Sequence, residues 1–356
     1  MQTKILQVKA GDLTEKQIQE VLAVWRRGGL AAFPTETVYG LGANALDADA
    51  VADIFAAKGR PADNPLIVHI GRIDQVKELV TEWTDTAQAL ASRFWPGPLT
   101  LVLPASPVVP GITRGGLATV GIRMPSHPVA LRLLQAAQLP IAAPSANTSG
   151  RPSPVDAGDV WEDLKGKIDL IVDGGRTGLG IESTVVSLEA GALRVLRPGG
   201  VTVEQLRQVA PVIVDAGALG QVPVEGPVAS PGMKYRHYAP KAPATLIEGE
   251  DLEALAAKVQ EVVAELAQSG IRVGVMASEP TCNRVTALPE QERIFALNVG
   301  PRGDTEVIAA NIYWALRELD RIGVDHIVIE GVPLSGMGLA VANRLRKAAG
   351  YNIITI

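Results

Sequence analysis

The order of apolar segments changes near residue 245, and this change limits the possible folds more than any other feature of the sequence. Beyond this point, short apolar segments typical of strands alternate strictly with longer segments of helical periodicity. Strict alternation is typical of a parallel sheet covered by helices. The expected strands cover 244–249, 271–277 and 326–332, and the expected helices cover 251–268, 304–319 and 338–348. We therefore predict a smaller, Rossmann-like parallel α/β domain over residues 245–356.

The first two hundred residues have a mixed order, in which some expected strands alternate with helices and others follow one another directly. This order favours a mixed, twisted α/β sheet with helices over residues 1–205. The expected helices cover 14–28, 48–57, 85–95 and 128–137, and the expected strands cover 4–8, 66–70, 99–105, 119–125, 139–145, 168–174, 183–188 and 193–197. Residues 206–244 become rich in Pro and Gly and are predicted to form a linker.

The composition excludes several classes of protein. A net charge of −5 argues against a broad basic surface, so we expect no stable direct binding of nucleic acid. The single cysteine, Cys282, cannot form an intramolecular disulfide or a zinc site of several thiolates. The sequence has no apolar run long enough to cross a membrane and no signal-peptide core, so we expect a cytoplasmic protein.

Two short polar segments are candidates for an anion site. Lys58 and Arg60 lie where an expected helix ends and a strand begins, and Ser145 and Asn147 follow another short strand. Lysine and arginine in loops are common partners of phosphate. The alternative is ordinary local chemistry, because cations are favoured at the C-terminal ends of helices and Ser and Asn are favoured in turns.

A second group of polar residues suits a small amino acid. The loop that begins at Pro34 places Thr35 and Thr37 on either side of a carboxylate, which could hold such a ligand or could simply cap a turn. His69 lies in an apolar strand, where a histidine is more often a packed core residue than a ligand or a base. Arg123 lies on another strand and must be either exposed or paired with an anion.

Several familiar sites are excluded. The glycine-rich loop before Ser183 lacks the Gly-Lys-Ser/Thr end of a phosphate-binding P-loop. The segment Gly336-Met337-Gly338 lacks the third glycine of a dinucleotide fingerprint. The four histidines have no metal-ligand spacing, and no GxSxG nucleophile motif is present.

Seven motifs occur together in a fixed order. They are PTETVYGLG (34–42), KGRPADNPL (58–66), PGPLTLVL (96–103), GIRMP (121–125), PSANTSG (144–150), STVV (183–186) and RPG (197–199). As a set they resemble the threonylcarbamoyl-AMP synthase family with its YrdC-like domain. The segments SPGMKYRHYAP (230–240) and SGMGLAVANRLRKAAG (335–350) resemble its long, two-domain form and extend the resemblance over nearly the whole chain.

The resemblance implies a nucleotidyltransferase. L-threonine, bicarbonate or carbon dioxide, and ATP would give threonylcarbamoyl-AMP and pyrophosphate, and a separate transferase would use the product to modify tRNA. N-carboxy-threonine would attack the α-phosphate of ATP without a covalent enzyme intermediate. The enzyme would then contribute orientation and charge stabilisation, together with Mg²⁺ held mainly by the ATP phosphates.

The resemblance also assigns residues by motif position. The implied contacts to L-threonine are Thr35, Thr37, His69, Arg123, Ala143 and Ser183, with Arg123 on the carboxylate. The implied contacts to ATP are Lys58, Arg60, Asn64, Thr119, Ser145, Asn147, Ser153, Arg197, Tyr235 and His237. Lys58 and Arg60 would have the catalytic role of neutralising the triphosphate. Tyr235 and His237 would close over ATP from the linker.

Two other functions are alternatives to this one. YrdC-like domains have also been considered as RNA-binding modules, which the net charge and the few aromatic residues disfavour. A carbamoyl-adenylate-forming domain of hydrogenase maturation would need cysteine-rich zinc modules and an acylphosphatase part. This chain has no residues for either.

Overall fold

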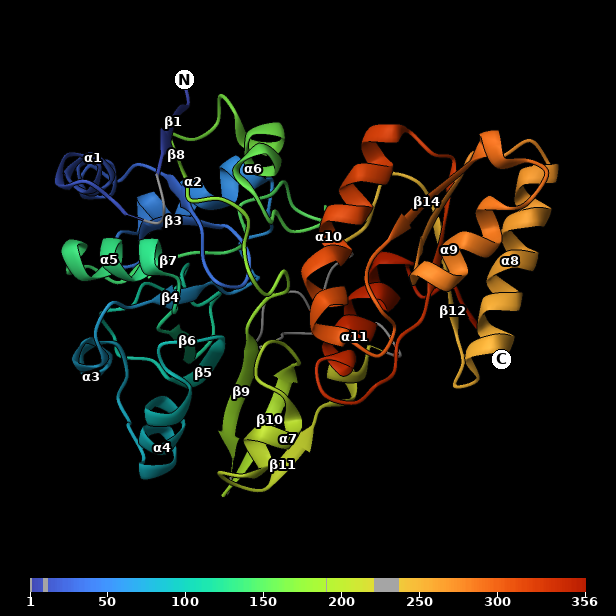
Figure 1. The fold of residues 1–356 in the computed structure, drawn as a ribbon. Helices are drawn as coiled ribbons and strands as arrows, with labels where there is room; N and C mark the ends of the chain where they lie inside the picture. The colour runs from blue at the N-terminus through green and yellow to red at the C-terminus, as the bar shows by residue number, and fades with distance from the viewer. Residues whose placement is uncertain (1, 9–11, 190, 221–236) are drawn as a thin grey trace. The chain divides into compact units, whose positions relative to one another are not determined.

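The computed structural model describes residues 2–8, 12–189, 191–220 and 237–356. Contacts divide these residues into two compact units. The first contains residues up to 149 together with 153–218, and the second contains 150–152, 219–220 and 237–356. Figure 1 colours the chain from its N-terminus in blue to its C-terminus in red.

The first unit is built on a mixed sheet of 11 strands in the order β1-β8-β2-β3-β7-β4-β6-β5-β9-β10-β11. Parallel and antiparallel pairs occur along the same sheet, as the mixed order of segments predicted. The strands are β1 (Lys4–Gln7), β2 (Ala31–Phe33), β3 (Gly40–Asn44), β4 (Ile67–His69), β5 (Leu99–Pro104), β6 (Thr119–Arg123), β7 (Ile141–Ala142), β8 (Leu170–Asp173), β9 (Thr184–Glu189), β10 (Ala192–Arg197) and β11 (Val212–Val214).

The last of these strands, β11, lies inside the range predicted as a linker. β11 pairs in parallel with β10, so part of the range predicted as linker, from residue 206, continues the sheet of the first unit. The helix α7 (Val203–Arg207) ends just inside the same range. The other domain boundaries stay a prediction, because the middle of the expected linker, residues 221–236, lies outside the described residues.

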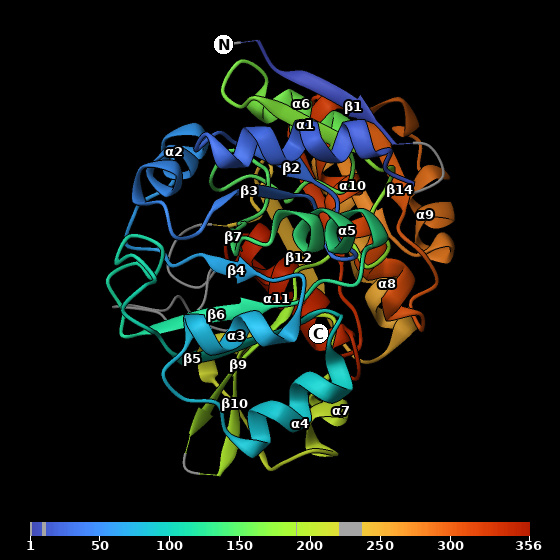
Figure 2. The ribbon, with the colours of Figure 1, turned by 90° about the vertical axis from the view of Figure 1, so that its left-hand side faces the viewer.

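Helices of the first unit follow the amphipathic pattern of the sequence. α1 (Glu15–Arg26) begins at Thr14, whose side chain and that of Gln17 form a capping box. α1 and α5 (Pro128–Ala137) are near each other in Figure 2 and contribute to one hydrophobic core. The remaining helices are α2 (Ala48–Lys58), α3 (Val76–Leu79), α4 (Asp85–Phe94) and α6 (Ala157–Leu164), with the 3₁₀ turns η1 (Ile73–Gln75) and η2 (Ala216–Leu219). A further 3₁₀ turn, η3 (Gln291–Arg293), belongs to the second unit.

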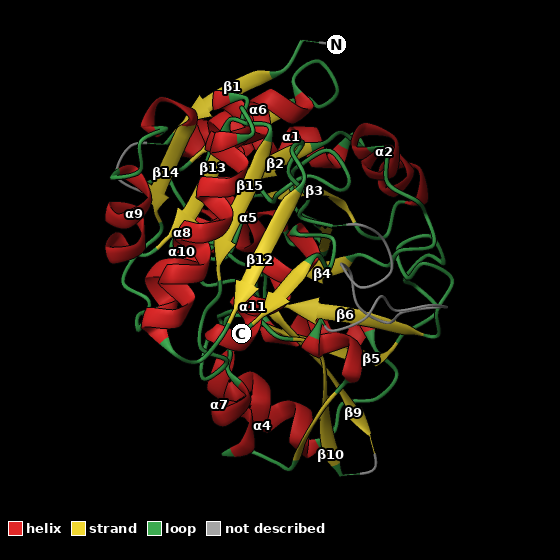
Figure 3. Cartoon of the chain, turned by 90° about the vertical axis from the view of Figure 1, so that its right-hand side faces the viewer, coloured by secondary structure: helices red, strands yellow, loops and turns green. Residues whose placement is uncertain are grey.

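The second unit is the predicted parallel α/β domain. Its five strands are all parallel and have the order β14-β13-β15-β12-β16, and Figure 3 shows β14, β13, β15 and β12 side by side. They are β12 (Ala244–Glu248), β13 (Val273–Ala277), β14 (Ile294–Asn298), β15 (His326–Glu330) and β16 (Ile353–Thr355). The helices are α8 (Leu252–Gln268), α9 (Glu279–Thr286), α10 (Thr305–Ile322) and α11 (Gly338–Ala348).

Two strands and one helix of this unit were not predicted. β14 and β16 are the two edges of the sheet, and their residues are mostly half-buried, which weakens the apolar signal of a strand. α9 is short and contains Pro280 in its first turn, a position that tolerates proline. Among the described residues, no helix combines the length and the apolar character that crossing a bilayer requires.

Candidate active site

Neighbouring strands bring two of the predicted threonine contacts together. β4 and β6 run parallel, and their register pairs His69 with Arg123 at the ends of both strands. Both side chains are buried, with 3% and 4% of their surface exposed. A fully buried arginine requires partners for its charge, so its surroundings define the site.

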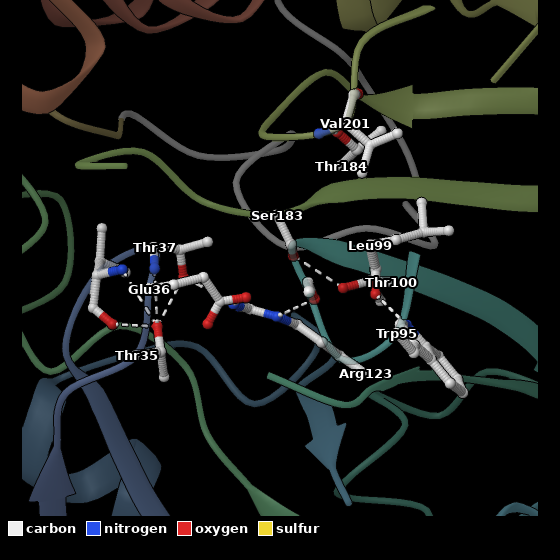
Figure 4. Close-up of polar contacts among 12 residues, drawn as sticks. Thr35, Glu36, Thr37, Trp95, Leu99, Thr100, Arg123, Ser183, Thr184 and Val201 are labelled. Atoms are coloured by element: carbon white, nitrogen blue, oxygen red, sulfur yellow. Dashed lines mark hydrogen bonds and ion pairs between the residues drawn. The ribbon is translucent and has the colours of Figure 1, made fainter. Parts of the chain in front are cut away.

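The hydroxyl groups of the 34–42 loop supply some of these partners, as Figure 4 shows. Arg123 Nη1 donates to Thr37 Oγ1 at 3.0 Å, and the two threonine hydroxyl oxygens of Thr35 and Thr37 are 2.7 Å apart. Thr35 Oγ1 donates to the Val38 carbonyl at 2.6 Å. Because that bond uses the Thr35 proton, the Thr37 hydroxyl must donate to Thr35. The loop therefore presents oriented hydroxyl groups to Arg123.

Glu36 supplies the opposite charge and is not among the predicted site residues. Its carboxylate Oε1 lies 2.7 Å from Arg123 Nη2, and its side chain is 14% exposed. The pair lacks the alignment of a hydrogen bond, and neither oxygen of the Glu36 carboxylate has a hydrogen-bond partner among the described residues. The carboxylate between two threonines was a signal in the sequence, but its pairing with Arg123 depends on the tertiary fold.

His69 is a neutral member of this group. Burial, and then the positive charge of Arg123, lower the pKa of His69 to about 3. Its Nδ1 lies 3.2 Å from the carbonyl oxygen of Ile67. Near neutral pH, His69 can therefore form hydrogen bonds but adds no charge to the site.

A second buried group joins β5, β9 and β10. Ser183 Oγ lies 2.8 Å from Thr100 Oγ1 and accepts from Arg197 Nη2 at 3.2 Å (Figure 4 draws the first contact). Arg197 Nε and Nη2 also donate to the Ser183 carbonyl at 3.1 and 3.0 Å. Thr100 is a further residue that the sequence analysis missed, since its contact arises from the parallel pairing of β5 with β9.

Lys58 does link the two predicted phosphate-binding segments, but through backbone oxygens. It is 1% exposed, and its Nζ donates to the carbonyls of Ser145 and Asn147, the latter at 2.6 Å. The Asn147 side-chain oxygen is 3.4 Å from the same nitrogen. Lys58 therefore fixes the shape of the 145–147 turn in this structure.

Arg60 and Asn64 occupy the following turn. Arg60 Nη2 donates to the carbonyls of Asn64 at 3.4 Å and Pro65 at 3.2 Å. The Asn64 side chain is 1% exposed, and neither its oxygen nor its nitrogen has a hydrogen-bond partner among the described residues. An unsatisfied buried amide is uncommon and is consistent with a polar ligand beside it.

The other predicted site residues do not share one set of contacts. Ser153 donates to the Glu182 carboxylate at 2.6 Å. Thr119 begins β6 and is half-buried, and the backbone N–H of the buried Ala143 donates to the Ile67 carbonyl at 3.0 Å. His237 is buried in the second unit. Tyr235 lies outside the described residues.

Within the described part of the chain, no three His, Cys, Asp or Glu side chains gather as metal ligands. The first unit thus combines buried arginines, oriented hydroxyl groups and a neutral histidine, which can bind a small polar substrate and anionic groups.

Comparison with known proteins covers both units. Residues 23–199 match the family described as "Telomere recombination", and residues 201–350 match the family described as "Threonylcarbamoyl-AMP synthase, C-terminal domain". The threonylcarbamoyl-AMP synthase of Pyrococcus abyssi is 50% identical over 345 residues, which cover 97% of each chain. That of Bacillus subtilis is 48% identical over 343 residues, covering 96% of this chain and 95% of its own.

A solved structure agrees with these matches. The crystal structure of Pyrococcus abyssi Sua5 complexed with L-threonine aligns with a TM-score of 0.91 and 47% identity, covering 99% of this chain and all of that one. The predicted α/β fold and the predicted enzyme class are thereby confirmed. The chain belongs to the threonylcarbamoyl-AMP synthase family, in its two-domain form.

Proposed function

We propose that the protein converts L-threonine, bicarbonate or carbon dioxide, and ATP into threonylcarbamoyl-AMP and pyrophosphate. The observation that carries this proposal is the buried Arg123, which lies against the Thr37 hydroxyl and beside a neutral His69. A relative of nearly equal length binds L-threonine in its crystal structure, and the two folds agree closely.

On the amino-acid side, the carboxylate of threonine would bind Arg123. A guanidinium offers two parallel N–H groups to a carboxylate, which fixes the orientation of the substrate. Thr35, Thr37, Ala143 and Ser183 would complete the site, with His69 as a hydrogen-bonding partner without charge. This arrangement would expose the threonine amine for reaction.

On the nucleotide side, ATP would lie along the turns that Lys58 and Arg60 organise. The unsatisfied amide of Asn64 supports a polar ligand here, since burying an amide without a partner costs about 1–3 kcal/mol. Arg197, held on the Ser183 carbonyl, would link this side to the threonine side. Thr119, Ser145, Asn147 and Ser153, with Tyr235 and His237 from the linker region, would complete the nucleotide contacts.

The reaction would proceed without an enzyme nucleophile. The threonine amine forms a C–N bond to carbon dioxide and loses a proton, which gives a carbamate. A carbamate oxygen then forms a bond to the α-phosphorus, and the bond from that phosphorus to the bridging oxygen breaks as pyrophosphate leaves. Lys58, Arg60 and Arg197 would stabilise the charge that develops on the leaving group. Magnesium on the phosphates would supply further neutralisation.

The product is a mixed anhydride of a carbamic acid with AMP. Its expected use is transfer of the threonylcarbamoyl group to an adenosine of tRNA by a separate transferase. The synthase itself would then bind threonine, ATP and bicarbonate without requiring direct tRNA binding, in agreement with a net charge of −5.

The test is product analysis by mass spectrometry after rapid quenching. Purified protein is incubated with ATP, Mg²⁺, L-threonine and bicarbonate, and each component is omitted in turn. We expect threonylcarbamoyl-AMP and pyrophosphate only in the complete mixture. The Arg123→Leu variant should form no product, whereas Arg72→Leu, a change at an exposed arginine, should react normally. Product formation without threonine or bicarbonate would contradict the proposal.

A further inference from the structure

The second unit contains a cavity of about 420 Å³. Its walls come from the segments that follow the parallel strands: the start of α8, the start of α9, the loop after β14 and the end of β15. A cavity of this size lies within the range of small-molecule sites and is too large for a single ion. None of the first unit's proposed reaction residues lines it.

The cavity lies at the carboxyl ends of the parallel strands. β13 continues through α9 to β14 on one side, whereas β15 continues through α11 to β16 on the other, and β13 and β15 are neighbours. The connections therefore diverge between these two strands, whose parallel arrangement is visible in Figure 3. Open parallel α/β sheets bind ligands outside the carboxyl ends of their strands at this topological switch point. Ser278 and Glu330, which line the cavity, lie at the ends of β13 and β15.

Arg302 provides a cationic group with spare hydrogen-bonding capacity. Its Nη2 donates to the Gly249 carbonyl at 2.7 Å and its Nε to the Gly331 carbonyl at 3.3 Å. Its Nη1 is buried and has no hydrogen-bond partner within the described ranges. Burial lowers the pKa of Arg302, and the negative charge of Glu330 acts in the opposite direction. An anionic group would satisfy this nitrogen by a charge-assisted hydrogen bond.

The N-terminus of α9 is already occupied by a carboxylate of the protein. Glu330 accepts from the Ser278 N–H at 2.5 Å and from the Thr281 hydroxyl at 2.9 Å. A ligand anion is therefore expected on Arg302 rather than at this helix end. Each carboxylate oxygen can accept more than one hydrogen bond, so Glu330 can also accept from hydroxyl groups of a ligand. A second lining pair, Arg284 with Glu253 at 2.5 Å, is self-compensated.

We propose that this cavity binds a nucleoside monophosphate, with the phosphate on Arg302 and the ribose hydroxyls on the Glu330 carboxylate. The apolar lining of Leu252, Ala256 and Pro301 receives the base. The site is separate from the residues proposed for the synthase reaction and does not depend on that reaction. Its ligand combines one anionic group, two or more hydroxyl groups and a flat apolar body, and the lining offers a cation, a carboxylate and apolar side chains for these three parts.

The experiment is hydrogen–deuterium exchange of the full chain with AMP as the probe, read by mass spectrometry of peptides. We expect AMP to slow exchange in peptides covering 278–284 and 298–302. Two variants address the site: Arg302→Gln removes the cation, and Ala256→Leu fills the cavity from α8. The matched controls are Arg293→Gln, which also loses a bond to a carbonyl, and Ala257→Leu, the exposed neighbour on the same helix. Protection in the first unit, where a nucleotide is proposed to bind, is recorded separately in the same data.

We expect the affinity for AMP to fall by at least about tenfold in Arg302→Gln and in Ala256→Leu. In both control variants the affinity should equal that of the parent protein. Because Arg302 also bonds two loop carbonyls, Ala256→Leu keeps the test decisive if Arg302→Gln unfolds. The proposal is overturned if AMP leaves both peptides unprotected, or if protection survives in both site variants. Equal protection by inorganic phosphate at the same concentration would overturn the assignment of a nucleotide.

Discussion

Arg123 Nη2 lies 2.7 Å from the Glu36 carboxylate, so the cation proposed to receive the carboxylate of threonine has an internal anionic partner. Both side chains are largely buried, and neither the Glu36 oxygens nor this arginine nitrogen has a hydrogen bond within the described residues. Threonine would therefore bring a second carboxylate to a cation that is already neutralised. We therefore expect this ion pair to affect both the stability of the chain and its affinity for threonine.

Replacing Glu36 by glutamine should separate these two effects. Loss of the buried partner charge leaves Arg123 uncompensated and should lower the free energy of unfolding by about 3 kcal/mol. The same change removes the repulsion of the incoming carboxylate, so L-threonine should bind several-fold more tightly. Chemical denaturation and calorimetric titration measure the two quantities.

The matched control for this change is Glu20→Gln, which breaks an exposed pair with Lys4 and should cost less than about 1 kcal/mol. Weaker threonine binding in Glu36→Gln would mean that Glu36 contacts the ammonium group of the substrate, and the competition described above would be wrong.

Lys58 should matter for stability as well as for turnover. Its buried Nζ donates to the carbonyls of Ser145 and Asn147, so Lys58→Met leaves these acceptors without their partner. We expect a loss of about 2 kcal/mol in unfolding free energy and a fall in kcat of at least about 100-fold. Denaturation and steady-state kinetics test this. The exposed Lys165→Met provides the comparison. A variant that keeps its stability and loses only activity would show that the bonds to the turn contribute little.

His69 should make stability depend on pH. Its pKa is lowered to about 3 in the folded chain, below the ordinary value near 6.5. The unfolded chain therefore binds a proton that the folded chain does not, so the stabilising contribution is present above pH 6.5 and is lost as the pH falls toward 3. The maximum slope is about 1.4 kcal/mol per pH unit. Chemical denaturation at pH 7 and at pH 5 gives the change in the free energy of unfolding between the two pH values. This change should be smaller in His69→Gln than in the parent protein, and equal changes would refute the lowered pKa.

Thr100 should orient Ser183. The isosteric Thr100→Val removes the hydroxyl group 2.8 Å from Ser183 Oγ while keeping the size of the side chain. We expect a loss of about 1 kcal/mol in stability and a several-fold higher KM for threonine. Thr81→Val, at an exposed threonine, is the control. An unchanged KM for threonine would indicate that Ser183 does not contact this substrate.

Cys282 should be unreactive in the folded protein. Its side chain is 7% exposed, and burial raises the pKa of its thiol to about 11. Because the thiolate is the reactive form, iodoacetamide at pH 8 should modify the thiol only after unfolding. Mass spectrometry of labelled protein with and without denaturant measures this, and rapid labelling of the native chain would be the contrary result.

Local patterns in the sequence predicted many elements of the fold. The apolar spacing of Ile18, Val21 and Leu22 with the cap at Thr14 predicted α1, and the strict alternation after residue 244 predicted the parallel sheet of the second unit. The edge strand β14 was missed because only one of its five residues is fully buried. A sequence pattern reports burial, and an edge strand has little of it.

The sequence motifs selected candidate site residues but did not predict the contacts between them. Motif order identified Arg123 and Lys58, yet the partners of both depend on strand register and on turns far away in the chain. Glu36 and Thr100 were missed for the same reason. Their importance comes from the atoms they contact across the sheet, and no local spacing encodes those contacts.

The most direct test of the proposed function follows the carbon atom of bicarbonate. The protein is incubated with ¹³C-labelled bicarbonate, L-threonine, ATP and Mg²⁺, and the adenylate product is fragmented in the mass spectrometer. We predict that the label lies in the carbonyl group that joins the threonine nitrogen to AMP, and that Arg123→Leu yields none of this product. An adenylate without the label, or one formed equally well by Arg123→Leu, would contradict the account.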